Sequence, residues 1–279
     1  MAIKIYKPTT PGRRQTSVLK HGHVKTSPQK SLLLSGKNFA GRNNQGKITV
    51  RHRGGGHRKQ VRIIDWQRDK FDIPATVATL EYDPNRNASI ALLHYADGEK
   101  RYMVAPQSLK VGDRVMSSQK LIELSVGNHM PLEVIPPGMF VYNVELTPGK
   151  GGQLARGAGN NIYLMSIDNG YAQLKMPSGE IRLVPAGSMA TIGTASNSEF
   201  KNVRWGKAGR MRHRGIRPTV RGKAMNPPDH PHGGGEGNNP IGMSGPKTKW
   251  GKPAYGVKTR RHKASNNLII ERRRSKKKK

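Results

Sequence analysis

The chain has 279 residues, with 50 Lys and Arg against 17 Asp and Glu, which gives a formal charge of +33 at pH 7. Self-repulsion at such a charge opposes compaction, so the composition disfavours an ordinary cytosolic enzyme and favours a polyanionic partner. The lack of cysteine excludes disulfides and thiolate metal sites, and the short apolar runs predict neither a secretory signal nor a membrane span.

The positive charge is unevenly distributed along the chain. Residues 1–60 carry a net charge of +14, residues 61–200 carry −1, and residues 201–279 carry +20. We therefore predict a basic N-terminal extension over 1–60, two folded domains over 61–125 and 126–200, and a basic Gly/Pro-rich C-terminal extension over 201–279. Because the extensions hold few apolar side chains, we expect them to gain structure only against an anionic partner.

The N-terminal extension ends in a glycine run that is surrounded by cations and histidines. Triple glycine lets a backbone approach another surface closely. We favour RNA contact here over the alternative, a flexible basic linker. The candidate RNA-binding residues are Arg51, His52, Arg53, Gly54, Gly55, Gly56, His57, Arg58 and Lys59. Upstream, Leu32–Leu34 is a small apolar patch that we expect to dock on the folded middle.

Residues 61–125 show the alternation and the turn signals of short strands. The predicted strands are Thr76–Tyr82, Ser89–Tyr95, Glu99–Val104 and Lys120–Leu124. About five strands without a long helix are typical of an oligonucleotide-binding (OB) barrel. The expected core residues are Ile63, Ile64, Val77, Leu80, Ile90, Leu92 and Leu121.

Residues 126–200 predict a second small barrel, of the Src-homology-3-like type. The expected strands are Met139–Leu146, Asn161–Ile167, Tyr171–Met176 and Glu180–Val184. Asp168-Asn169-Gly170 is typical of a hairpin turn with positive φ. In the last strand we expect Ile181 and Leu183 to point one way and Arg182 the other, as in a sheet with one solvated face.

Two glycine-rich loops within the middle of the chain do not fit a nucleotide site. Gly149–Gly152 lacks the Lys-Ser/Thr ending of a P-loop. Gly157–Gly159 is not followed by the helix and distant acid of a dinucleotide fingerprint. We expect simple turns whose Lys150 and Arg156 face phosphate.

The C-terminal extension opens with a ladder of cations that contains no acid. The candidate RNA-binding residues in it are Arg204, Trp205, Lys207, Arg210, Arg212, Arg214, Arg217, Arg221, Asp229, His230, His232, Trp250, Arg260 and Arg261. An aromatic side chain among cations can stack on a base. For Trp205 and Trp250, covering the β domain is an equal alternative.

Asp229-His230-Pro231-His232 places an acid beside two imidazoles, which suits a general base or a metal site. We regard His230 as a weak catalytic candidate only, since the loop offers neither a rigid element nor a third metal ligand. Hydrogen bonding of both histidines to RNA is the favoured interpretation, with Asp229 orienting one imidazole or a water bound to Mg²⁺.

Five motifs together resemble one family, ribosomal protein two of the large subunit in its bacterial form. They are Arg51–Arg58, Gly151–Gly159, Gly206–Arg210, Gly215–Gly222 and Met225–Gly237. The resemblance implies two β-barrels with basic extensions and primary binding to large-subunit (23S-type) ribosomal RNA (rRNA). It also implies roles in subunit association, tRNA binding and support of the peptidyl-transferase region. Its equivalent of His230 has been suspected in peptide-bond formation.

These observations lead to a structural constituent of the ribosome that is not an enzyme. We expect neighbouring ribosomal proteins, the small subunit and the tRNA region as further partners, and no membrane. We expect a cytoplasmic location in the ribosome and no cofactor apart from Mg²⁺ bound through rRNA. The alternatives are direct catalysis by His230 and a free architectural protein that binds single strands.

Overall fold

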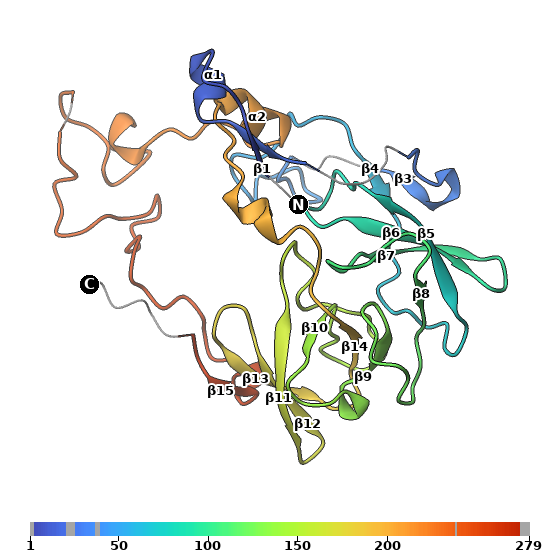
Figure 1. Cartoon of the computed structure of the whole chain (residues 1–279). Helices are drawn as coiled ribbons and strands as arrows, with labels where there is room; N and C mark the ends of the chain where they lie inside the picture. Colours follow the sequence, from blue (N-terminus) through green and yellow to red (C-terminus); the bar gives the residue numbers. More distant parts are fainter. Residues whose placement is uncertain (1–2, 21–25, 37–39, 238, 274–279) are drawn as a thin grey trace. The chain divides into compact units, whose positions relative to one another are not determined.

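The computed structural model describes residues 3–20, 26–36, 40–237 and 239–273, and its fold is mostly β, as predicted (Figure 1). The chain forms two compact units. The barrel unit comprises Met1–Lys37, Arg58–Lys207 and Ser265–Lys279, and the basic unit comprises Asn38–His57 and Ala208–Ala264. Each unit combines segments that are far apart in the sequence. The domain boundaries at residues 60, 125 and 200 stay a prediction.

Short strands dominate the barrel unit. The strands are β1 (Ile3–Ile5), β2 (Ser17–Leu19), β3 (Leu33–Ser35), β4 (Gln60–Arg62), β5 (Ala75–Glu81), β6 (Ile90–Tyr95), β7 (Lys100–Val104), β8 (Arg114–Val115), β9 (His129–Pro131), β10 (Phe140–Tyr142), β11 (Ile162–Asp168), β12 (Tyr171–Lys175), β13 (Ile181–Pro185), β14 (Met189–Ile192) and β15 (Ile269–Glu271).

The helices are short and lie between the strands. They are α1 (Pro11–Arg14), η1 (Lys30–Leu32), η2 (Leu132–Val134), η3 (Ser198–Asn202), α2 (Ala208–His213), η4 (Gly222–Ala224) and η5 (Ala264–Asn266). Among the described residues, no helix combines the length and the apolar character that crossing a bilayer requires.

The first barrel is built on a four-stranded antiparallel sheet in the order β7-β6-β5-β8. The predicted turn at residues 83–85 separates β5 from β6, and the predicted hairpin at residues 96–98 joins β6 to β7. A register shift between Val77 and Thr79 interrupts the pairing of β5 with β6, and such a bulge bends its strand. Val77 is fully buried in the core beneath this sheet, as predicted.

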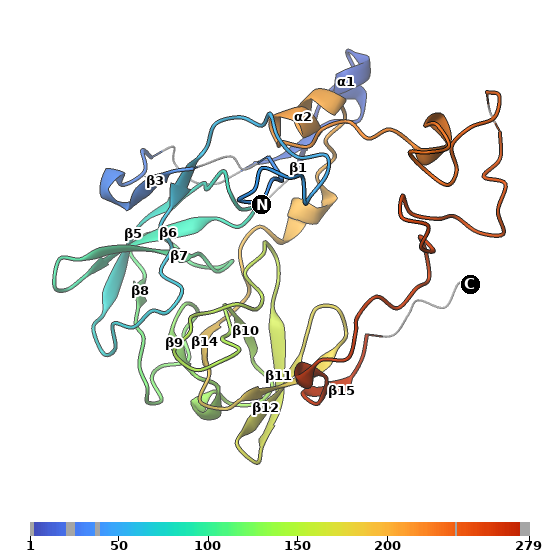
Figure 2. The same cartoon turned by 180° about the vertical axis from the view of Figure 1, so that it is seen from behind.

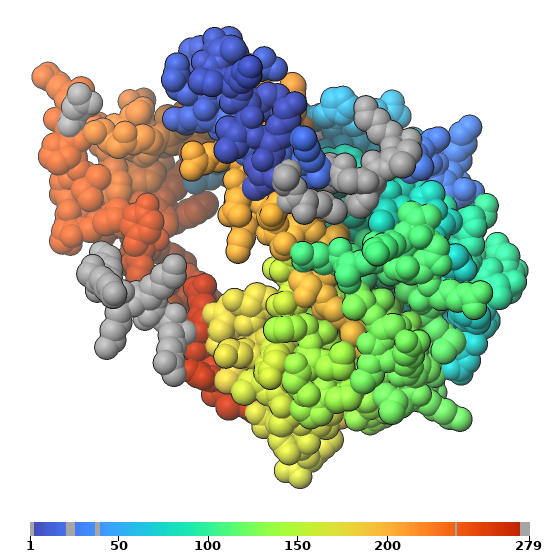
Figure 3. Space-filling view, in the orientation of Figure 1, coloured from blue at the N-terminus to red at the C-terminus, as the bar shows by residue number. Residues whose placement is uncertain are grey.

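The second barrel is built on a seven-stranded sheet in the order β15-β13-β12-β11-β10-β14-β9. The hairpin between β11 and β12 turns at Asn169 (φ 49°) and Gly170 (φ 76°), which confirms the predicted positive-φ turn. β15 comes from the C-terminal extension and pairs with β13. Figure 3 shows this last strand, in red, lying against the yellow strands of the sheet. A segment beyond residue 200 therefore completes the sheet.

A third apolar cluster joins the two barrels. It combines Ile90, Leu92 and Tyr102 of the first barrel with Tyr142 of the second. The Tyr142 hydroxyl donates to the Val104 carbonyl at 2.9 Å, so its polar atom is satisfied inside the joint. Burial raises the pKa of Tyr142 above its usual value, which keeps the phenol protonated.

The predicted docking of the apolar N-terminal patch is confirmed. Leu32 packs against this third cluster, and the Gln29 amide donates to the Tyr102 hydroxyl at 2.9 Å. The patch ends there, since Leu34 is exposed.

The predicted core is correct in part. Ile64, Val77, Ile90 and Leu92 are buried, and Leu80 is partly buried against the core of the first barrel. The expectation for Ile63 and Leu121 is wrong, because their exposed fractions are 42% and 61%.

The strand expected over Lys120–Leu124 does not form, and this segment is an irregular connection between the barrels. Ile122 packs against the core of the second barrel, while Leu121 and Leu124 on either side of it are exposed. The apolar pattern of this segment therefore buries the Ile122 side chain, although the segment itself does not pair as a strand.

The strand expected over Met139–Leu146 is shorter than predicted. It ends at Tyr142, because Asn143 adopts a positive φ of 50° that no extended strand contains. After this break the chain resumes with an isolated bridge between Val144 and Leu154.

Side chains alternate along β13 as expected, but Arg182 is on the inward face and not on a solvated one. Val184 lies opposite Ala172 and Arg182 lies opposite Leu174, and both of these β12 partners are fully buried. The inward side of β13 therefore carries Val184 and Arg182 rather than the isoleucine and leucine between them. Pairing register decided the facing, since a shift of one residue exchanges the two faces of a strand.

Leu174→Ala should lower the free energy of unfolding by about 2–5 kcal/mol, because it removes a fully buried side chain from the second barrel core. Lys175→Ala, at the next and exposed position of β12, is the control and should change it by about 0.5 kcal/mol or less. Urea unfolding of the full chain measures both. Equal losses in the two variants would contradict this core.

Candidate nucleic-acid interface

The basic unit concentrates charge without enclosing a core. Its segments, residues 38–57 and 208–264, hold 17 Lys and Arg against two acidic residues, Asp229 and Glu236, a net charge of +15. Of its described residues only Gly54 is buried. Apolar burial therefore cannot offset the mutual repulsion of its cations.

A backbone ladder holds the two segments of the basic unit together. The Gly54 amide donates to the Gly215 carbonyl at 2.9 Å, and the His57 amide donates to the His213 carbonyl at 2.9 Å. On the other side of Gly54, the Arg217 amide donates to the His52 carbonyl at 3.1 Å. The two motifs that sequence analysis marked separately therefore form one element.

The glycine run serves this ladder. A Cβ at Gly56 would lie 2.9 Å from the Gly215 nitrogen, so the two backbones meet where no side chain fits. Gly54 and Gly55 both have positive φ, 124° and 64°. We predicted that the glycines bring the backbone close to RNA. In the structure the close approach is to the chain itself, and contact of these glycines with RNA stays a prediction.

The ladder displays cations rather than burying them. Arg51, Arg53, Arg214, Arg217 and Arg221 are exposed. Arg210 and Arg212 lie in the last turn of α2, where the carbonyl end of a helix favours positive charge. The Arg212 guanidinium also donates to the Ile216 carbonyl at 3.4 Å, which ties the helix to the ladder.

The two histidines of the polar loop are held by backbone donors. The His232 amide donates to Nδ1 of His230 at 3.0 Å, and the Lys247 amide donates to Nε2 of His232 at 2.9 Å. An imidazole nitrogen that accepts is unprotonated, so His230 carries its proton on Nε2 and His232 carries its proton on Nδ1. The ring centroids lie 4.8 Å apart.

The loop around the histidines is closed by its own backbone. The Gly233 amide donates to the His230 carbonyl at 2.8 Å, and the Gly234 amide donates to the Met225 carbonyl at 3.0 Å. A Cβ at Gly222 would lie 2.5 Å from the His230 ring, so the imidazole rests on this glycine. The expectation of a loop without a rigid support is therefore wrong.

Asp229 does not form the expected constellation. It is exposed, and the hydrogen bonds of the two imidazoles come from backbone amides rather than from its carboxylate. Within the described parts of the chain, no group of three His, Asp or Glu side chains is arranged to hold a metal ion. The acid of the motif therefore does not orient either ring.

The surroundings keep His230 uncharged. Partial removal from water lowers its pKa below the ordinary value, and the neighbouring His232, Arg51 and Lys249 lower it further. Arg51 lies 5.5 Å from the centroid of the Trp250 ring, an exposed aromatic residue of the same unit. Trp250 therefore stands beside a cation and does not cover the β domain as a buried residue.

The barrel unit adds a second basic feature around Trp66. The Arg156 guanidinium lies 4.3 Å from the Trp66 ring centroid and that of Arg86 lies 5.1 Å from it. The Gly152 amide donates to the Trp66 carbonyl at 2.9 Å, which fixes the loop that carries Lys150 and Arg156. Sequence analysis found Arg156 but missed Trp66 and Arg86, because only the fold brings the three together.

The remaining sequence candidates are spread over both units. Arg58 and Lys59 precede β4 in the barrel unit, and Trp205 packs on Phe200 with ring centroids 5.9 Å apart. Arg260 and Arg261 are exposed in the basic unit. The structure therefore gathers most of the candidates in the basic unit, and the barrel unit carries the rest, which are Arg58, Lys59, Lys150, Arg156, Arg204, Trp205 and Lys207.

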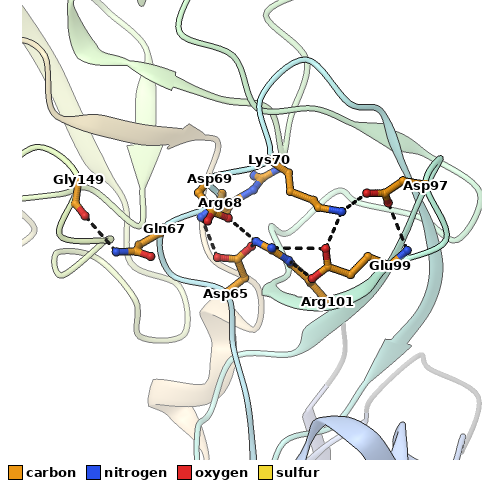
Figure 4. A network of polar contacts seen from close by, with 9 residues as sticks. All are labelled: Asp65, Gln67, Arg68, Asp69, Lys70, Asp97, Glu99, Arg101 and Gly149. Atoms are coloured by element: carbon orange, nitrogen blue, oxygen red, sulfur yellow. Dashed lines mark hydrogen bonds and ion pairs between the residues drawn. The ribbon is translucent and has the colours of Figure 1, made fainter.

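One face of the first barrel has the opposite character. Arg101 bonds Asp65 at 2.9 Å and Glu99 at 2.7 Å, and also contacts Asp69, while Lys70 bonds Glu99 at 2.5 Å (Figure 4). Partial burial opposes the charge of Arg101, yet these carboxylates raise its pKa. The two cations of this network are therefore engaged within the protein.

Comparison with known protein families identifies the family of this chain. Residues 29–117 match the family described as Ribosomal Proteins L2, RNA binding N-terminal domain, and residues 125–251 match Ribosomal Proteins L2, C-terminal domain. The chain belongs to the ribosomal protein L2 family. The resemblance seen in the sequence motifs is thereby confirmed.

Membership of the L2 family makes the chain an RNA-binding protein of the large ribosomal subunit. The two matched regions contain the ladder, the histidine loop and the Trp66 cluster. The predicted fold, an OB-like barrel followed by a small Src-homology-3-like barrel, agrees with this family.

Gly56→Ala should open the ladder of the basic unit, because its Cβ would press on the Gly215 backbone. We expect the Gly54 and His57 amides to exchange hydrogen roughly five- to tenfold faster, since removing a hydrogen bond costs about 1 kcal/mol. Hydrogen exchange followed by NMR measures this. Gly245→Ala is the control, because a Cβ there meets nothing within 4 Å. Unchanged exchange in Gly56→Ala would refute the ladder.

His230 should titrate below the ordinary histidine value of about 6.5. Because its folded pKa is lowered, the loop should be fully stable above about pH 6.5 and lose stability as the pH falls below that value, where the unfolded chain binds the proton first. NMR titration of the imidazole measures the midpoint. Arg51→Ala removes one nearby charge and should raise the midpoint; a wild-type midpoint above 6.5 would contradict this environment.

Proposed function

We propose that this protein is a primary binder of 23S-type rRNA that neutralises and orders RNA segments within the large subunit. The observation that carries the proposal is the basic unit, which gathers a net charge of +15 with a single buried residue among those described. Such a unit requires an anionic partner for compaction, and the phosphate backbone of RNA supplies one.

The proposed division of labour follows from the two units. The barrels contribute a shape that fits folded RNA, and the Trp66 cluster contributes an aromatic face flanked by guanidinium groups, which suits an RNA nucleotide. The basic unit contributes exposed cations for phosphates. The proposed RNA-binding residues are Arg51, His52, Arg53, Gly54, Gly55, Gly56, His57, Arg58, Lys59, Lys150, Arg156, Arg204, Trp205, Lys207, Arg210, Arg212, Arg214, Arg217, Arg221, Asp229, His230, His232, Trp250, Arg260 and Arg261.

Further roles follow from family membership. We propose that the protein supports association of the subunits, binding of tRNA and the peptidyl-transferase region, next to neighbouring ribosomal proteins in a cytoplasmic ribosome. We propose no cofactor of its own, with Mg²⁺ reaching the protein through rRNA.

We propose a structural role for His230 rather than direct catalysis. Its Nδ1 already accepts the His232 amide, and Asp229 does not partner either ring. In catalytic triads a carboxylate orients the histidine base and stabilises its charged form, and Asp229 does neither for His230. The nearby cations instead oppose protonation, which suits a neutral imidazole that donates from Nε2 to an RNA oxygen.

Competition binding tests the proposed function. The full chain is bound to labelled 23S-type rRNA at physiological salt and challenged with bulk tRNA and messenger RNA. We expect the rRNA to be retained, with an affinity that falls steeply as salt rises, because counterions are released on binding. Equal competition by all RNAs would instead identify a free architectural protein.

Arg156→Ala should weaken this binding and lower the magnitude of the salt slope by about 0.7–0.9 for each phosphate that the variant no longer neutralises. Arg156→Lys keeps the charge but removes the planar group that lies over Trp66. Its salt slope should therefore be close to that of the unaltered protein, while its affinity should stay lower. Filter binding across a salt series measures both quantities. Lys175→Ala, which removes an exposed cation of β12, is the control.

A further inference from the structure

The N-terminal segment of the chain pairs with the start of the C-terminal extension inside the barrel unit. The Ser17 amide donates to the Arg204 carbonyl at 3.0 Å, and the Arg204 amide donates to the Ser17 hydroxyl at 2.8 Å. Thr16 and Ser17 are buried in this contact. Both views show the β1–β2 hairpin and α1 next to the stretch that follows η3 (Figures 1 and 2).

Glycines make the approach close. A Cβ at Gly206, whose φ is 73°, would overlap the Thr16 hydroxyl and lie 3.0 Å from the Gly12 carbonyl oxygen. The Lys207 side chain in turn passes over Gly12, where a Cβ would meet its Cδ at 3.4 Å. The two segments therefore form one packed surface, although about 190 residues of sequence separate Thr16 from Trp205, whose carbonyl accepts from the Thr16 hydroxyl.

Cations crowd this surface. Residues 3–20 and 198–207 together contain eight Lys and Arg but a single acid, Glu199. Arg13, Arg14, Arg204 and Lys207 are all exposed. None of the ion pairs found among the described residues involves these four side chains.

An aromatic ring stands within the same cluster. Tyr6 lies between two cations, with Lys4 at 5.7 Å and Arg13 at 5.1 Å from its ring centroid. Thr10 caps α1 by accepting the Arg13 amide at 3.3 Å, which fixes the turn that presents Arg13 and Arg14. Positive side chains fixed around a planar ring are suited to a phosphate backbone with an adjoining base.

We propose that Tyr6, Arg13, Arg14, Arg204 and Lys207 form a composite site that binds one continuous segment of rRNA. The proposal rests on the proposed function and adds to it that the N-terminal segment and the start of the C-terminal extension act on the same RNA segment. Folding brings together the two segments that carry these four cations, and a strand of phosphates offsets their repulsion. Two extensions that act independently would instead contact separate RNA segments.

Directed cleavage of RNA tests this arrangement. Because the chain has no cysteine, Gln15→Cys and Asn202→Cys each provide a single attachment point for a hydroxyl-radical probe. Both residues are exposed and flank the site without belonging to it. In a complex of the full chain with 23S-type rRNA, we expect the two probes to cut overlapping nucleotides, and a probe at Ser178→Cys to cut elsewhere.

A glycine substitution separates the two halves of the site. Gly206→Ala should push residues 204–207 away from Thr16, so the two sets of cuts should no longer overlap. Gly209→Ala is the matched control, since a Cβ there meets nothing within 4 Å. Overlap that persists in Gly206→Ala would overturn the packed surface.

Coupling between the cations gives an independent measurement. Arg13→Ala with Arg14→Ala, and Arg204→Ala with Lys207→Ala, should each weaken rRNA binding roughly tenfold, and all four together by less than the product, because they serve one RNA segment. Strictly multiplicative losses with disjoint cuts would overturn the composite site. If the unaltered chain failed to prefer 23S-type rRNA at all, the proposed function would fail first.

Discussion

Mutual repulsion among cations is the constraint on which this structure depends. The basic unit carries a net charge of +15, and its described residues enclose no apolar cluster that could offset it. Repulsion between charges of one sign is weakened by solvent and salt but is not removed. The protein solves half of this problem by backbone pairing, which brings segments together without enclosing side chains. The repulsion that remains suits the unit to a polyanionic partner, in keeping with a family that binds RNA.

In the basic unit, close backbone contacts at glycines hold the segments together in place of an apolar core. In the barrels, buried side chains such as Leu164 and Leu174 fill an apolar core. In the basic unit, the distance between segments is set by positions where a Cβ would collide with another backbone, as at Gly56 and Gly233. Contact between backbones leaves the cationic side chains free to point outward. A close approach at a glycine recurs in the barrel unit, where Gly206 meets Gly12 and Thr16.

The cations of the barrel unit differ in whether their partners are carboxylates or an aromatic ring. On the first barrel, Lys70 and Arg101 are held by four carboxylates and are not available to phosphate. Around Trp66, Arg156 lies over an aromatic ring, and Arg86 lies near the same ring while it also pairs with Asp83 at 2.6 Å. Burial of RNA phosphates against carboxylates would be unfavourable, so this network is poorly suited to contact with a phosphate backbone.

The sequence alone determined the features that depend on local chemistry. The charge partition, the β class, the Asn169-Gly170 turn and the docking of Leu32 follow from residue types and short-range spacing, and the structure agrees with them. The five motifs identified the family because they are long and nearly span the chain.

Tertiary structure decided everything that depends on which distant segments meet. The register of β12 with β13 placed Arg182 inward, and a last strand from the C-terminal extension completed the second sheet. The partner of the glycine run was residues 213–217, and the orienting groups of both histidines were backbone amides. Backbone hydrogen bonds are open to nearly every residue type, so side-chain identity does not specify their partners; only the folded path of the chain does.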